Sequence, residues 1–143
     1  ADIPDACIGA DVIVGFPGET EDDFLETYNF LNELNISYLH VFTYSGRSNT
    51  GAIEMGKRVS KEMKADRSKM LHILSDKKRR YFHDQFIKKN RPVLFENMKN
   101  GKIVGHTDNY IKVQVEGGAS LINMIQSVMM KENHTSLVSG VLN

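Results

Sequence analysis

Near its start the chain carries a β-branched apolar run, a glycine-rich turn and an acidic helix start, and together these restrict the fold most. Val12, Ile13 and Val14 predict a short strand buried on both faces, because uninterrupted apolar residues are typical of parallel sheets. Residues 15–19 predict a tight turn, and Thr20 is a suitable N-cap for the helix that follows. Such a strand, turn and helix form one βα unit, whose ligands bind beyond the carboxyl end of the strand. The turn is therefore the first candidate ligand site.

The turn does not follow the common phosphate-binding patterns. No Lys-Ser or Lys-Thr pair follows Gly18, and the spacing Gly-x-Gly-x-x-Gly is missing. A glycine turn after a buried strand can also be a packing device without any ligand. Both interpretations stay open at this point.

The next segments extend the same sheet. A helix predicted over residues 21–34 leads to a strand predicted over residues 36–44, and the two strands are expected to be parallel. A loop over residues 45–56 then places Arg47 at the same edge as the glycine turn. Ser60 is a possible N-cap of a long helix, which should stop near Asn90 because Arg91 precedes a proline.

After Pro92 the apolar period changes from helical spacing to alternation. Asn100-Gly101 is a strong signal for a two-residue hairpin. Short strands are predicted over residues 93–96, 102–104, 109–115, 125–130 and 136–142. Five short strands in this space predict a small closed barrel of the oligonucleotide-binding kind, which should fold independently.

Charge is distributed unevenly along a chain of zero net charge. The 143 residues are 41% hydrophobic and 25% charged, with no apolar run long enough to span a membrane. Residues 1–60 hold 10 acidic and 3 basic residues, whereas residues 61–91 hold 4 acidic and 11 basic ones. The middle segment is therefore expected to meet a polyanion or an acidic surface. The one cysteine excludes an internal disulfide and favours a cytoplasmic location.

Three local patterns resemble one enzyme family. The stretch from Asp11 to Thr20, Asp-Val-Ile-Val-Gly-Phe-Pro-Gly-Glu-Thr, resembles a late-strand motif of the radical-SAM methylthiotransferases. The stretch from His40 to Ala52 resembles the strand and loop that follow it in those enzymes. The last fifty or so residues resemble a TRAM domain, whose central strands match Gly105-His-Thr-Asp-Asn-Tyr-Ile-Lys-Val. The Asp-Asn-Tyr form is most similar to the threonylcarbamoyladenosine branch of the family.

The resemblance implies an α/β fragment of a radical-SAM partial (β/α) barrel followed by a small all-β, OB-like TRAM barrel. Its expected parts are residues 1–59, the last βα units of the radical-SAM barrel, residues 60–91, a basic helical connector, and residues 92–143, the TRAM barrel. The intact enzyme would use S-adenosylmethionine and two [4Fe-4S] clusters to add a methylthio group to a modified adenosine next to the tRNA anticodon. Cys7 alone cannot hold a cluster, so this fragment is expected to be inactive and to need the N-terminal part of the same enzyme.

The resemblance also implies site residues and partners. tRNA is the expected partner, and neither DNA nor a membrane is expected. No metal site and no catalytic residue is assigned within the fragment. The alternatives are that Phe16 belongs to the core, that Arg47 pairs with the acidic first segment, and that the barrel residues form a solvated charged face. The residues expected on the S-adenosylmethionine side are Val14, Gly15, Phe16 and Pro17, and those expected to contact tRNA or substrate are Arg47, Lys99, Lys102, His106, Tyr110 and Lys112.

Two other functions fit the same patterns. The chain could be an RNA-binding module without catalysis, or part of a methylthiotransferase that modifies a ribosomal protein. An assay of modified nucleosides distinguishes a methylthiotransferase that modifies tRNA from one that modifies a ribosomal protein. The basic run from Lys77 to Arg80 is a further candidate RNA contact, although basic helix faces are often only solvated.

Overall fold

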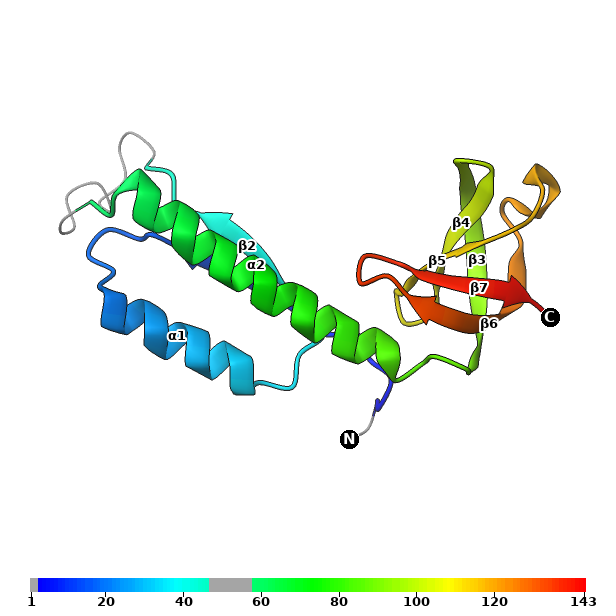
Figure 1. Cartoon of the computed structure of the whole chain (residues 1–143), viewed down its shortest axis with the longest axis horizontal. Coiled ribbons are helices and arrows are strands. Elements are labelled where there is room, and N and C mark those ends of the chain that lie inside the picture. The colour runs from blue at the N-terminus through cyan, green and yellow to red at the C-terminus, as the bar shows by residue number, and fades with distance from the viewer. Residues whose placement is uncertain (1–2, 47–57) are drawn as a thin grey trace. The chain divides into compact units, whose positions relative to one another are not determined.

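The computed structural model describes residues 3–46 and 58–143 (Figure 1). The chain divides into two compact units. We call Ile8–Ser75 the rim unit, and Ala1–Cys7 together with Asp76–Asn143 the barrel unit. The expected division of the chain at residues 59/60 and 91/92 stays a prediction.

The rim unit is built on a parallel pair of strands joined by a helix. β1 (Gly9–Val14) pairs with β2 (Tyr38–Thr43) from Gly9 opposite Tyr38 to Val14 opposite Thr43, and α1 (Glu21–Glu33) connects them. The predicted β-α-β unit is thus confirmed. Its core lies between the sheet, α1 and α2 (Lys61–Asp84), and consists of Val14, Phe24, Leu31, Leu39, Leu71 and Leu74.

The prediction that the first strand is buried on both faces was wrong. Ile13 is 58% exposed, and Phe42, its partner on β2, is 52% exposed. Side chains alternate between the two faces of a strand, so Val14 points into the core while Ile13 points to the other face. Within the described residues, no element covers that second face.

The amino ends of both helices are capped as predicted. The Thr20 hydroxyl accepts a hydrogen bond from the Asp23 N–H at 3.2 Å, and the Asp23 carboxylate accepts one from the Thr20 N–H at 2.9 Å. These bonds to Thr20 lower the pKa of Asp23. The Ser60 hydroxyl likewise accepts from the Met63 N–H at 3.1 Å.

α2 ends at Asp84, not near Asn90 as predicted. The backbone leaves the helix because β6 binds it instead: Lys88 N donates to Met130 O at 2.8 Å, and Met130 N donates to Lys89 O at 3.0 Å. Lys88 adopts a left-handed conformation at φ 65°, which ends the helical path.

The barrel unit contains the predicted small closed barrel of five strands. The strands follow the order β3-β4-β5-β7-β6, with β5 and β7 as the parallel pair. Positive φ angles at Asn100 (52°) and Gly101 (78°) confirm the predicted hairpin turn. The elements are β3 (Asn90–Lys99), β4 (Lys102–Thr107), β5 (Lys112–Val115), a short 3₁₀ turn η2 (Ala119–Leu121), β6 (Ile125–Asn133) and β7 (Val138–Leu142).

Phe86 joins the barrel core two residues after α2 ends, and the last turn of the helix packs there through Phe82. Asn133 of β6 fastens it, because its amide donates to Arg80 O at 3.0 Å and to the Asp84 carboxylate at 2.7 Å. His83 lies in the same turn and is 5% exposed, with a buried Nδ1 that has no hydrogen-bond partner. Burial disfavours the charged imidazolium and lowers the pKa of His83 below its ordinary 6.5.

The barrel unit should therefore lose stability in mild acid. Because the folded pKa of His83 is lowered, the unfolded chain binds the proton first as pH falls below 6.5. The free energy of unfolding is then highest above that pH and falls toward the lowered folded pKa. Denaturant melts between about pH 5.5 and 8 should show this fall, and H83L should flatten it. The matched control H72L replaces an exposed histidine and should leave the fall in place. An unchanged pH profile in H83L would assign the effect to another group.

Candidate functional site

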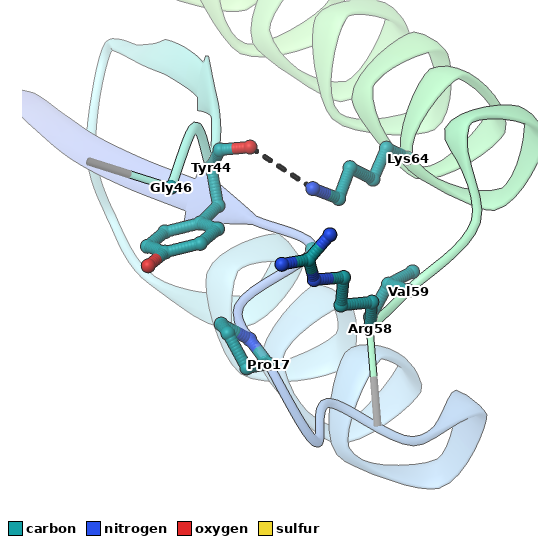
Figure 2. Close-up of a pocket in the computed structure, with 7 residues that line it drawn as sticks. Pro17, Tyr44, Gly46, Arg58, Val59 and Lys64 are labelled. Carbon is teal, nitrogen blue, oxygen red and sulfur yellow. Dashed lines mark hydrogen bonds between the residues drawn. The ribbon is translucent and has the colours of Figure 1, made fainter. Parts of the chain in front are cut away.

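A cavity of about 240 Å³ lies where β1 and β2 end. In Figure 2 the Arg58 guanidinium points into the space between Tyr44 and Lys64. Both strand ends contribute, because Gly15 directly follows β1 and Tyr44 directly follows β2. The cavity is lined by Gly15, Pro17, Tyr44, Gly46, Arg58, Val59 and Lys64.

The structure separates the four residues expected on the S-adenosylmethionine side. Gly15 and Pro17 line the cavity, whereas Val14 is buried in the core of the rim unit. Phe16 is 43% exposed and packs edge-to-face on Tyr44, with ring centroids 5.2 Å apart. Phe16 is therefore not a core residue in this unit. Arg47 lies outside the described residues.

Glycine is required at position 15 for two reasons. Its φ of +77° is a conformation that L side chains rarely adopt, and a Cβ there would overlap the aliphatic part of the Lys64 side chain. The backbone of the turn therefore approaches α2 closely and borders the cavity without a side chain in between.

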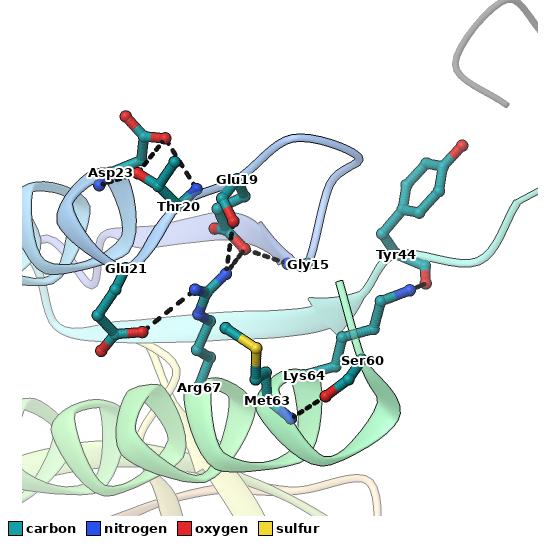
Figure 3. A network of polar contacts seen from close by, with 10 residues as sticks. All are labelled: Gly15, Glu19, Thr20, Glu21, Asp23, Tyr44, Ser60, Met63, Lys64 and Arg67. Atoms are coloured by element: carbon teal, nitrogen blue, oxygen red, sulfur yellow. Dashed lines mark hydrogen bonds and ion pairs between the residues drawn. The ribbon is translucent and has the colours of Figure 1, made fainter. Parts of the chain in front are cut away.

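A network of polar contacts holds the turn in place (Figure 3). The Glu19 carboxylate accepts a hydrogen bond from the Gly15 N–H at 2.6 Å and from Arg67 Nη1 at 2.7 Å. Arg67 Nη1 also donates to the Glu19 carbonyl at 3.2 Å, and Nη2 lies 3.2 Å from the Glu21 carboxylate. The guanidinium is 5.4 Å from the Phe24 ring centroid. Arg67 is only 2% exposed, so this ion pair is shielded from water.

Lys64 lies on α2, like Arg67, and borders the cavity opposite the turn. Its Nζ donates to the Tyr44 carbonyl at 3.0 Å and lies 5.4 Å from the Tyr44 ring centroid. Lys64 and Arg67 are three positions apart, so they share one face of α2. Sequence reasoning missed Tyr44, Arg58 and Lys64; basic residues at i and i+3 near the start of a helix were the available signal.

The structure divides the residues expected on the barrel into two groups. Lys99 and Lys102 flank the hairpin turn, and Lys102 Nζ pairs with the Glu116 carboxylate at 3.0 Å. His106 and Lys112 lie opposite each other on β4 and β5. At about 3.3 Å per residue, His106 lies roughly 13 Å along β4 from Lys102. The expected contact surface is thus split along β4.

Tyr110 belongs to the second group but not to a strand. It was predicted within a strand over residues 109–115, but β5 begins at Lys112. The Tyr110 N–H instead donates to the Thr107 carbonyl at 3.0 Å, and the Thr107 hydroxyl accepts from the Ile111 N–H at 2.9 Å. The resulting turn leaves Tyr110 73% exposed, which agrees with its predicted position on the surface.

The described residues contain no group of three or more His, Cys, Asp or Glu side chains that could hold a metal ion. Nor does this part of the chain contain a helix that is long and apolar enough to cross a membrane.

Known proteins match the sequence of this chain across both units. No protein-family model matches the chain. A threonylcarbamoyladenosine tRNA methylthiotransferase of Bacillus subtilis is 39% identical over 131 residues, which cover 88% of this chain and 29% of the relative. The chain is homologous to part of the tRNA methylthiotransferases. The enzyme of the same name from Aquifex aeolicus is 39% identical over 114 residues, or 80% of this chain and 27% of the relative.

A second branch of these methylthiotransferases matches as well. A tRNA-2-methylthio-N(6)-dimethylallyladenosine synthase of Syntrophus aciditrophicus is 35% identical over 140 residues, which cover 96% of this chain and 30% of the relative. The chain thus spans less than a third of the length of these methylthiotransferases. The resemblance to this enzyme class is confirmed, and identity is higher to the two threonylcarbamoyladenosine enzymes named here.

Proposed function

We propose that this chain is the C-terminal, tRNA-binding part of a radical-SAM methylthiotransferase that acts on a modified adenosine next to the anticodon. The observation that carries the proposal is the homology to tRNA methylthiotransferases across both units. The rim unit corresponds to the last βα units of a radical-SAM barrel, and the five-stranded barrel to a TRAM domain.

The cavity at the rim fits one side of S-adenosylmethionine. Gly15 offers backbone without a side chain, and Tyr44 offers a ring, which together suit a flat purine. Bound S-adenosylmethionine supplies the activated methyl and adenosyl groups of the reaction. The residues present do not fit an iron–sulfur cluster, because the chain contains one cysteine and a cluster needs several thiolates. We assign the cluster ligands to the remainder of the enzyme.

A chimera tests the activity. The chain replaces the matching segment of the Bacillus subtilis methylthiotransferase, and the nucleosides of tRNA from cells carrying it are analysed by mass spectrometry. Methylthiolated threonylcarbamoyladenosine is the expected product. Methylthiolation of dimethylallyladenosine would overturn the branch, and methylthiolation of a protein without tRNA product would favour the ribosomal-protein alternative.

Binding of tRNA to the 143-residue chain should be weak and only moderately sensitive to salt. A neutral chain with few lysines on the barrel face neutralises few phosphates, so log K should fall against log salt with a slope of about −2 to −3. K112A should make that slope shallower by about 1, because one phosphate contact is lost. K131A, on β6 of the same barrel, is the matched control and should leave the slope unchanged. Equal slopes in wild type and K112A would place the phosphate contacts elsewhere, with Lys77–Arg80 as the next candidate.

A further inference from the structure

Four side chains form a row across one outer face of the barrel. Ile125 of β6 lies opposite Leu94 of β3, Leu94 opposite His106 of β4, and His106 opposite Lys112 of β5. Residues directly opposite on neighbouring strands share a face and contact one another. Leu94 is 44% and Ile125 68% exposed. The row therefore runs from an exposed apolar end to a basic end.

An aromatic pair stands beside the basic end. The Tyr110 ring stacks on the His106 ring, with centroids 5.0 Å apart and planes 23° from parallel. Tyr110 has a φ of 67°, an unfavourable backbone conformation for a bulky residue. Burial does not compensate for it, because the residue is 73% exposed. Strained residues of this kind concentrate at functional sites.

Glu96 fixes the orientation of this pair. Its carboxylate lies 2.7 Å from His106 Nδ1. An ionised carboxylate can only accept, so Nδ1 carries the hydrogen and Nε2 is the nitrogen left for a ligand. Glu96 stands at an irregularity of β3, where the register with β4 shifts between Phe95 and Asn97. Such bulges redirect a side chain, here toward the imidazole.

We propose that this face binds one unpaired nucleobase together with a neighbouring phosphate. The base stacks on the exposed face of Tyr110, Leu94 and Ile125 provide apolar contact beside it, and Lys112 binds the phosphate. His106 and Glu96 are positioning residues, since they hold the Tyr110 ring. The base must be unpaired, because a base within a duplex keeps its faces covered by its neighbours. The inference rests on the tRNA-binding role proposed above and adds the place and the type of contact.

Fluorescent RNA tests the stacking directly. The full 143-residue chain is titrated with a short single-stranded RNA that carries 2-aminopurine, whose fluorescence is quenched on stacking, and with a fully paired duplex of the same length. The wild type should prefer the single strand and quench the probe. Y110A should bind the single strand at least tenfold more weakly and lose the quenching, with duplex binding unchanged. Y110F keeps the ring and should behave like the wild type.

Variants of Glu96 separate positioning from plain electrostatics. E96A removes a negative charge, so a purely electrostatic surface would bind RNA more tightly. If Glu96 positions His106, E96A should instead bind the single strand three- to tenfold more weakly and reduce the quenching. E96Q keeps an acceptor for Nδ1 and should restore both. Melting curves of each variant exclude loss of folding as the cause.

The outcomes distinguish this inference from the proposed function. If the wild type binds RNA and Y110A binds it equally well with unchanged quenching, the stacking site is wrong while tRNA binding stands. If the wild type binds neither RNA, the proposed tRNA-binding role fails together with the site. Tighter binding of RNA by E96A would refute only the positioning role of Glu96 and would leave the stacking site in place.

Discussion

R67A is expected to lower the free energy of unfolding of the rim unit by about 3 kcal/mol or more, because breaking a buried ion pair leaves the partner charge uncompensated. Arg67 and Glu19 are 3% and 14% exposed at their side chains. The variant also removes the contact with the Phe24 ring. The contact to Glu21, which is 61% exposed, should contribute little. Denaturant unfolding followed by circular dichroism measures the loss.

Two further substitutions serve as controls. R67K keeps the charge but loses the forked geometry that reaches Glu19 and Glu21 together, so it should lie between wild type and R67A. R79A breaks an exposed pair with Asp76 and should change the free energy of unfolding by no more than about 0.5 kcal/mol. If R67A were no more harmful than R79A, the buried pair would not stabilise the turn.

G105A is expected to destabilise the barrel unit by about 3 kcal/mol, close to the upper end of the usual range for overpacking. A Cβ at position 105 would overlap the Leu94 carbonyl oxygen and lie 2.8 Å from Phe95 Cα. Both are backbone atoms of β3, and they can move away only if the β3–β4 pairing is disturbed. The gain from restricting the unfolded chain, at most about 1 kcal/mol, does not offset this. Thermal and denaturant melts measure the change.

G118A is the matched control in the same unit. A Cβ there would meet only Ser120 Oγ at 3.8 Å, an ordinary contact, and the φ of −95° suits any residue. Its stability should equal or slightly exceed that of the wild type. Equal stability of G105A and G118A would contradict a tight approach of β3 to β4.

Sequence reasoning succeeded where the deciding interactions are short-range. The cap at Thr20 depends on a residue three positions away, and the hairpin at Asn100-Gly101 depends on two residues that tolerate positive φ. Alternation after Pro92 predicted a closed five-stranded barrel because each strand must bury one face. Of the site, the turn at Gly15 and the exposed position of Tyr110 were also predictable in this way.

The sequence alone thus determined which kinds of helix and strand form, their order along the chain, the parallel strand pair of the rim unit and the closed barrel of the barrel unit. Periodicity and turn chemistry act within a few residues, so a sequence pattern is enough to show them. Only the tertiary structure decided which distant groups meet. Arg67 reaches Glu19 across 48 positions, and Lys64 reaches Tyr44 across 20. α2 stops at Asp84 because the backbone of β6 offers hydrogen bonds to the residues that follow. These contacts depend on loop closure and packing in three dimensions, which no local pattern encodes.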